Sequence, residues 1–307
     1  MANITAEMVK TLRDKTGAGM MDCKAALGET KGDFEAAVDW LRKKGLSKAA
    51  KKASRTAAEG LIGIASAPGK AAVIEVNSET DFVARNEHFQ KFVHGAAKSA
   101  LDVEGDVEKL LTRPFEGAPT MADALNNLIA KVGENMKVRR AEAISVSPGV
   151  VATYVHNAAT PHLGKIGVLV ALQSSAPADK LMALGKQLAM HIAATSPLAV
   201  TADELNPQLV TRERAIFADQ ARQSGKPENL IEKMVEGRLR KFYEESVLTS
   251  QIFVVDGETP IAKVIEKAAK DFGAPIQIVD FARFAVGEGI EKEETDFAAE
   301  VKAAAGH

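Results

Sequence analysis

The stretch Ile74–Val83 reads IEVNSETDFV, and the rest of the chain can be understood from it. Ile74 and Val76 alternate with Glu75 and Asn77, which is the period of a strand with one buried face. The alternation stops after Asn77, where polar residues that favour turns take over. The pattern therefore predicts a half-buried strand that ends in a polar turn.

An aromatic residue follows that turn, at a point where the chain should be near the surface. Phe82 stands between Asp81 and Val83. A Phe left in water forgoes about 1.5–3 kcal/mol of burial free energy. Two interpretations remain open: Phe82 packs beneath its own domain, or it is held out for the pocket of a partner. Taken alone, the residues favour the first.

Composition limits the class of protein. A chain of 307 residues is long enough for two or more domains. Its net charge of −2 gives no strong field towards nucleic acid or an anionic membrane. The single cysteine, Cys23, excludes an internal disulfide and suits a reducing, cytoplasmic compartment. The opening residues, MANITAEMVK, lack the apolar core of a signal peptide, and no later run reaches membrane-span length.

Residues 1–45 are predicted to form three short helices. Thr5 can cap the first helix and Asp33 the third, which Gly45 should end. The third helix carries apolar residues at i, i+3, i+4 and i+7, namely Phe34, Ala37, Val38 and Leu41. So short a segment can hold only a marginal core, which favours a docking module over an enzyme.

Residues 46–59, LSKAAKKASRTAAE, are rich in alanine and are predicted to form a helical linker. Their basic residues, Lys48, Lys51, Lys52 and Arg55, raise the alternative of an RNA-binding chaperone. No aromatic residue lies among them for base stacking, and the total charge is balanced. A solvated linker face is therefore favoured.

The core is predicted to contain two similar α+β lobes with antiparallel sheets. The first lobe covers residues 60–148 and the second covers 149–202 and 247–286. In each lobe two strands are followed by a helix. The predicted strands are 61–66, 71–76, 138–146, 150–155, 165–172, 251–255 and 276–286, and the predicted helices are 87–101, 121–133, 179–194 and 261–272.

Residues 203–246 interrupt the second lobe and are strongly helical, with a break at Ser224–Pro227. The second arm has apolar residues at i, i+4, i+8 and i+11, namely Ile231, Val235, Leu239 and Phe242. This stripe is narrow, which predicts an antiparallel coiled-coil hairpin that protrudes from the core. The hairpin could serve self-association or contact with a partner. Residues 287–307 are predicted to form a C-terminal helical module.

The chain shows no arrangement of residues that is typical of bond chemistry. Its six histidines have no paired metal-ligand spacing, and no GxSxG motif is present. An enzyme would have to rely on Cys23 or on His156. We therefore expect a binding protein with no catalytic residue, no metal site and no cofactor.

Two motifs carry a family resemblance. The segment Leu12–Leu27, LRDKTGAGMMDCKAAL, and Thr80–Val83, TDFV, resemble bacterial translation elongation factor Ts. The similarity continues through IGVLVAL, QSGKPENLIEKMVEGR and FAVGEGIEKEETDFAAEV, at residues 166–172, 223–238 and 284–301. It spans essentially the whole chain in the same order.

The resemblance implies a guanine-nucleotide exchange factor that binds elongation factor Tu, both GDP-bound and nucleotide-free. Members of the family displace Mg²⁺ from that partner and promote GDP release so that GTP can rebind. They combine a three-helix module like ubiquitin-associated domains, two α+β subdomains, a coiled-coil hairpin and a C-terminal helical module. The resemblance requires no nucleic acid and no membrane, and it allows a homodimer formed through the hairpin.

The resemblance also assigns roles to residues. The wedge that displaces Mg²⁺ would be Thr80, Asp81, Phe82 and Val83. The resemblance thereby reverses the interpretation of Phe82, whose side chain would be held out for the partner. Further partner contacts would be Arg13, Met20, Met21 and His156, the last in a Tyr-x-His pattern. The loop Asn157–Gly164 after His156 is longer than in some relatives, which bears on the pose of that side chain.

Overall fold

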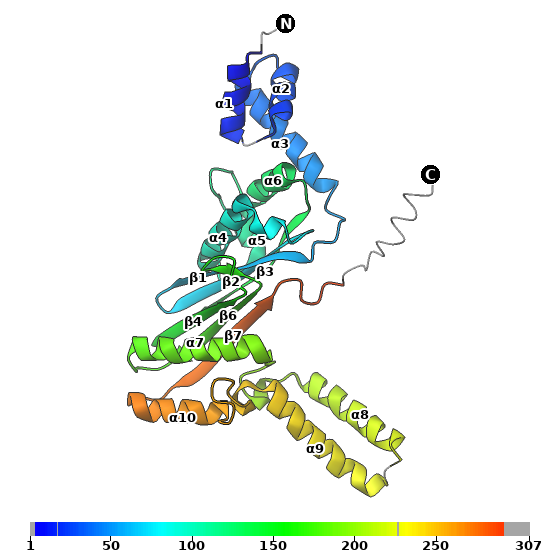
Figure 1. Cartoon of the computed structure of the whole chain (residues 1–307), viewed down its shortest axis with the longest axis vertical. Helices are drawn as coiled ribbons and strands as arrows, with labels where there is room; N and C mark the ends of the chain where they lie inside the picture. The colour runs from blue at the N-terminus through cyan, green and yellow to red at the C-terminus, as the bar shows by residue number, and fades with distance from the viewer. Residues whose placement is uncertain (1–3, 17, 226, 292–307) are drawn as a thin grey trace.

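The structure is a computed structural model that describes residues 4–16, 18–225 and 227–291. Figure 1 shows a small helical module at one end, a central block of sheets and helices, and a helical hairpin at the other end. The module consists of α1 (Ala6–Thr16), α2 (Met20–Glu29) and α3 (Phe34–Ala50). The three predicted N-terminal helices are therefore present.

The module has a small core of its own. Leu12, Cys23 and Leu27 are fully buried in it. The predicted cap is present, since the Asp33 carboxylate accepts a hydrogen bond of 2.9 Å from the Ala36 amide at the start of α3. The module therefore has its own buried apolar core, separate from the cores of the sheets.

The prediction that Gly45 ends the third helix is wrong. Helix α3 continues to Ala50, so residues 46–59 are helical only in their first part and then form turns before the first strand. Gly45 lies against Asn127 and Ala130 of α6 (Met121–Val132). Packing of α3 on α6 keeps the helix intact through the glycine, a tertiary contact that outweighs local propensity.

The central block contains two antiparallel sheets. The first has the order β3-β2-β1-β5 and the second β4-β6-β7. The strands of the first are β1 (Glu59–Ala67), β2 (Lys70–Ser78), β3 (Met136–Ser145) and β5 (Leu163–Gly164). Those of the second are β4 (Gly149–His156), β6 (Ile166–Gln173) and β7 (Gln277–Ala285). The predicted α+β class with antiparallel sheets is confirmed.

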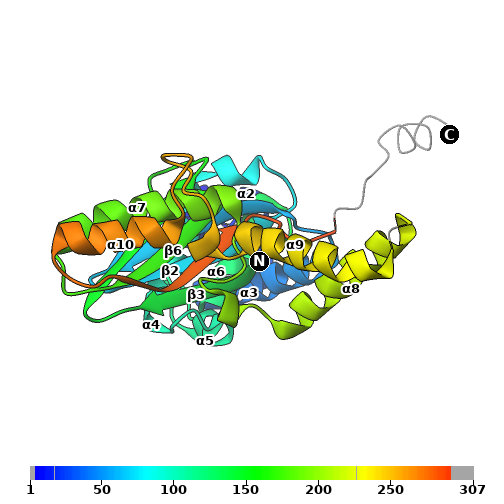
Figure 2. The ribbon, with the colours of Figure 1, turned by 90° about the horizontal axis from the view of Figure 1, so that it is seen from below.

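Helices cover the outer face of each sheet, and the two inner faces pack together. The outer helices are α4 (Glu87–Asp102), α5 (Val107–Thr112) and α6 on the first sheet, and α7 (Ala178–Thr195) and α10 (Ile261–Phe272) on the second. Ile64, Val73 and Leu169 meet between the sheets. The order helix, sheet, sheet, helix is visible in Figure 1, and Figure 2 shows α7 and α10 lying across the strands when the block is seen from below.

Burial on both faces corrects one expectation for the strand before the TDFV motif. The alternation predicted Glu75 and Asn77 on an exposed face, but both are buried together with Ser78. Ile74 and Val76 face the helices, and Glu75 and Asn77 face the second sheet. The alternation in the sequence cannot show that a second sheet covers that face of the strand.

A second expectation also fails. Residues 251–255, QIFVV, form no strand, because the short helix η3 (Leu248–Ser250) is followed by turns. The side chain of Gln251 is buried, where its Oε1 lies 2.8 Å from His191 Nε2 and its Nε2 donates to the Glu245 carbonyl. These side-chain hydrogen bonds keep the segment from pairing as a β-strand, although its residues are apolar and favour strands.

The hairpin consists of α8 (Pro207–Gln223) and α9 (Glu228–Ser246), and it projects from the second lobe (Figure 1). Its apolar cluster contains Ala221, Ile231, Val235 and Leu239. This cluster is separate from the cores of the two sheets. Packing between two arms rather than against the block accounts for the narrow apolar stripe.

The described chain ends just beyond β7, where residues 286–289 form a turn. The predicted C-terminal helical module, 287–307, lies outside the described residues from 292 onward. Within the described part of the chain, no helix combines the length and the apolar character needed to span a membrane.

Candidate partner interface

Two long loops leave the block at the same edge. Ser78, at the end of β2, pairs with Glu59 of β1. The Lys165 ammonium lies 3.1 Å from the Glu59 carboxylate, and the Lys165 amide donates to the His156 carbonyl. The loop after β2 and the loop after β4 are therefore neighbours, on the side towards which β7 runs in Figure 1.

The loop after β2 displays an aromatic side chain. Phe82 is 74% exposed, whereas the next residue, Val83, is 4% exposed and belongs to the core of the first lobe. The Ala84 and Arg85 amides donate to the carbonyls of Asp81 and Phe82, at 3.2 and 3.1 Å. A tight turn anchored by Val83 therefore holds Asp81 and Phe82 outward.

The start of this loop is tied to the loop between α6 and β3. The Thr80 amide and hydroxyl both donate to the Glu134 carboxylate, at 2.9 and 2.7 Å. The Ser78 hydroxyl also donates to the Thr80 carbonyl, at 3.0 Å. Thr80 is thus a half-buried attachment point, and it differs in that respect from the exposed residues Asp81 and Phe82.

A buried carboxylate underlies the same strand. Glu75 accepts hydrogen bonds from Arg139, from Arg140 and, at 2.8 Å, from the Gly287 amide. Burial would raise the pKa of Glu75, but hydrogen bonds from Gly287, Asn77 and Arg140 outweigh it and lower that pKa from its ordinary value of 4.5. The ionised side chain joins the first sheet to the turn after β7.

The N-terminal module presents the predicted contact residues to solvent. Met20 and Met21, in the first turn of α2, are 60% and 74% exposed. Arg13 is exposed on α1. Two large apolar side chains in water on so small a module are typical of a binding surface, to which flexible methionines adapt well.

The structure places His156 at the exposed end of β4, where the Tyr154 hydroxyl lies 3.1 Å from its Nδ1. The loop that follows is attached to the first lobe. Leu163 and Gly164 pair with β1, and the His162 ring stacks on His94 of α4 with centroids 5.8 Å apart. The longer loop is thus held against the first sheet, and His156 stays at its base.

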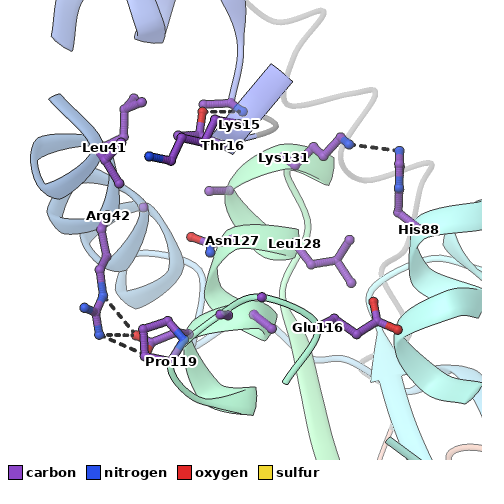
Figure 3. Close-up of a pocket in the computed structure, with 18 of the residues that line it drawn as sticks. Lys15, Thr16, Leu41, Arg42, His88, Glu116, Pro119, Asn127, Leu128 and Lys131 are labelled. Atoms are coloured by element: carbon purple, nitrogen blue, oxygen red, sulfur yellow. Dashed lines mark hydrogen bonds and ion pairs between the residues drawn. The ribbon is translucent and has the colours of Figure 1, made fainter. Parts of the chain in front are cut away.

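A cavity of about 670 Å³ separates the N-terminal module from the first lobe (Figure 3). Arg42 of α3 donates to both carboxylate oxygens of Asp123 on α6, each at 2.9 Å. Further along α6, Lys131 Nζ lies 2.9 Å from Nε2 of His88 on α4. The Arg42–Asp123 pair is a bidentate contact that links the module to the lobe.

The residues named for the enzyme alternative are placed unfavourably. Burial raises the pKa of the Cys23 thiol, which keeps it protonated and unreactive. The side-chain contact of the His156 Nδ1 atom is with the Tyr154 hydroxyl and not with a carboxylate that could orient the ring for catalysis. Among the residues that the structure describes, no group of three His, Cys, Asp or Glu side chains could hold a metal ion.

Comparison with known proteins identifies the family. The model of the family described as elongation factor TS matches residues 79–288. The chain belongs to the elongation factor Ts family. The resemblance noted in the sequence is confirmed, and the chain has the role of a translation elongation factor.

Curated relatives agree over their full length. Elongation factor Ts from Rhodospirillum centenum is 60% identical over 307 residues, which cover 100% of both chains. The protein of the same name from Parvibaculum lavamentivorans is 60% identical over 306 residues, 99% of each chain. That from Gluconobacter oxydans is 58% identical and covers 100% of this chain and 99% of its own.

Within this elongation factor Ts fold, sequence reasoning named the displayed residues and missed those that hold them. Glu134 and Asn135 lie more than fifty positions from Thr80 and Glu79, which they contact, in a loop with no pattern of its own. Glu75 was assigned to an exposed face. A carboxylate in a strand of apolar residues was the one signal that a buried charge pair was present.

Proposed function

We propose that the chain is a guanine-nucleotide exchange factor for elongation factor Tu, to which it binds in the GDP-bound and nucleotide-free states. It promotes GDP release so that GTP can rebind. The observation that carries this proposal is the exposed Phe82 side chain on a loop that is fixed at both ends, in a member of the elongation factor Ts family.

The wedge acts by displacing Mg²⁺ in the partner. In nucleotide sites Mg²⁺ is held by phosphates and by few protein groups, and it offsets the phosphate charge. Removing Mg²⁺ therefore weakens the binding of GDP to the partner. Burial of Phe82 in the partner contributes about 1.5–3 kcal/mol, enough for a ten- to hundredfold loss of GDP affinity. Asp81 accompanies it, while Val83 and Thr80 keep the loop in place.

Affinity comes from the rest of the footprint. Arg13, Met20 and Met21 bind the nucleotide-binding domain, and His156 contacts a second domain. Coupling between two ligands of one protein is reciprocal. Because the factor lowers the affinity of elongation factor Tu for GDP, bound nucleotide lowers its affinity for the factor. GTP that refills the site therefore releases the factor.

On this proposal the chain makes and breaks no covalent bond, so it is not an enzyme, and it needs no cofactor, nucleic acid or membrane. It acts in the cytoplasm, where translation takes place. The hairpin has two roles open to it, contact with elongation factor Tu or formation of a homodimer.

The test is the release of a fluorescent GDP analogue from elongation factor Tu, with and without the chain. Acceleration that saturates with the concentration of the chain is expected. An unchanged release rate would overturn the proposal. Co-purification should also yield a complex that excess GDP dissociates, with its stoichiometry, and the state of the hairpin, read from light scattering.

A further inference from the structure

The loop that displays Phe82 rests on one carboxylate from a distant part of the chain. Glu134 Oε2 accepts from the Thr80 amide at 2.9 Å, and Oε1 accepts from the Thr80 hydroxyl at 2.7 Å. Hydrogen bonds to an ionised acceptor are stronger than neutral ones. Two of them on one residue fix the backbone two positions before Phe82.

The neighbouring residues extend this attachment to the linker below the N-terminal module. The Asn135 amide donates to the Glu79 carboxylate, and the Asn135 side chain donates to the Arg55 carbonyl at 2.7 Å. The Arg55 guanidinium lies 3.5 Å from Glu79. Residues 134 and 135 thus join the linker to the start of the displayed loop.

The far side of the loop is fixed independently. Val83 is buried in the core, and the Asn86 side chain accepts from the His88 amide at 2.9 Å to cap α4. Between these two supports the exposed residues are Asp81 and Phe82. If the Glu134 support is lost, Val83 still holds the loop, but its first half is free to move.

We propose that Glu134 is a positioning residue that pre-organises the wedge. The inference rests on the proposed exchange function and adds the residue on which it depends. A wedge that must be ordered as it enters the partner spends binding energy on that ordering. Loss of Glu134 therefore lowers the maximal rate of GDP release, while the module and the second lobe preserve the affinity for the partner.

The first test titrates elongation factor Tu, loaded with a fluorescent GDP analogue, with Glu134→Ala, Glu134→Gln and the wild-type chain. Lys137→Ala is the control, since that side chain is exposed on β3. Glu134→Ala should lower the maximal rate about tenfold, as expected for lost bonds to a charged acceptor, with half-saturation within about twofold.

The glutamine variant retains an amide oxygen that accepts from Thr80, so it should recover most of the rate, and Lys137→Ala should match the wild type. A wild-type maximal rate in Glu134→Ala would overturn the proposal. A change confined to half-saturation would also overturn it, since that result assigns Glu134 to binding.

The second test needs no partner. Hydrogen exchange in the free chain should show the Thr80 amide exchanging about tenfold faster in Glu134→Ala, with the amides of β2 and α4 unchanged. Equal exchange at Thr80 in the two chains would overturn the positioning role even if Glu134→Ala lowers the maximal rate of GDP release. If the wild-type chain fails to accelerate GDP release, the proposed function fails, and hydrogen exchange still decides whether Glu134 holds the loop.

Discussion

The two lobes share a framework and differ in which connection is long. In the first lobe a tight turn at Pro68–Gly69 joins β1 to β2, and eight residues, 79–86, join β2 to α4. In the second lobe the lengths are reversed. Residues 157–165 follow β4, and only Ser174–Pro177 separate β6 from α7.

This reversal places both long loops at one edge of the block. The short connections gather at the opposite edge, where the Val146 amide donates to Gly69 and the Ser174 amide donates to Pro148. Loops tolerate change and carry binding residues, whereas strands and helices keep the core. Two copies of one plan can therefore serve one partner surface through different connections.

The two lobes also differ at equivalent irregularities in their central strands. The register shifts between Glu75 and Val76 in the first sheet, and between Ala171 and Leu172 in the second. Both shifted positions are buried, but one holds a carboxylate and the other a methyl group. The carboxylate lies in the lobe that displays Phe82, and it is this lobe that the turn after β7 contacts through the Gly287 amide.

The largest effect is expected at that carboxylate. Glu75→Gln removes the buried carboxylate that Arg139 and Arg140 share, leaving Glu288 at 3.3 Å as the anion at Arg140, and should cost about 3 kcal/mol of unfolding free energy at pH 7. Because the folded pKa of Glu75 is lowered, its stabilisation is complete above the ordinary value of 4.5 and is lost as the pH falls through the folded pKa. Urea denaturation between pH 3 and pH 7, at about half-unit steps, measures both effects.

Glu142 on β3 is the matched control. Burial, together with the nearby Asp280, raises the pKa of this carboxylate, so its ionised form opposes folding at neutral pH. Glu142→Gln should leave the unfolding free energy at pH 7 unchanged or slightly higher. An equal loss in both variants would mean that packing, and not charge pairing, explains the role of Glu75.

The next largest effect compares the connections from strand to helix in the two lobes, residues 79–86 in the first and Ser174–Pro177 in the second. Phe82→Ala should leave the chain folded and slow GDP release from elongation factor Tu by about ten- to a hundredfold, from the burial it forgoes. Ser175→Ala, at the exposed corresponding connection of the second lobe, should have no effect. Release of a fluorescent GDP analogue measures both, and a wild-type rate in Phe82→Ala would remove the wedge role.

A smaller effect is expected at the strand-to-strand loop of the second lobe. His156→Ala should weaken the complex by about 1 kcal/mol, near fivefold in affinity, and preserve the maximal release rate. Ala158→Ser on the same exposed loop is the control. Titration calorimetry with nucleotide-free elongation factor Tu gives the affinity; a lowered maximal rate would show that His156 takes part in displacement.

The smallest effect concerns the hairpin. Replacing Thr211–Lys241 by a short Gly-Ser linker should leave the thermal unfolding of the lobes within about 1 °C, well below the shift that a 1 kcal/mol loss would cause. The reason is that the apolar cluster of the arms is separate from both sheet cores. Scanning calorimetry measures this, and cooperative loss of the whole transition would show that the lobes depend on the arms.

The sequence predicted those elements whose periodicity matches what they bury. The IGVLVAL run became β6, and the apolar positions Ile231, Val235 and Leu239 became the seam of the hairpin. It failed where a contact from elsewhere decided the outcome. Gly45 stays helical because α6 supports it, and residues 251–255 form no strand because Gln251 bonds to α7.

The sequence by itself therefore determined the fold class, most of the elements, and the family through motifs such as TDFV. Tertiary structure alone decided that Phe82 is exposed while Val83 is buried, and that Glu75 lies between two sheets. It also brought Glu134 to Thr80. The physical reason is range: periodicity and capping act over a few neighbouring residues, whereas burial and charge pairing depend on residues that only the folded chain brings together.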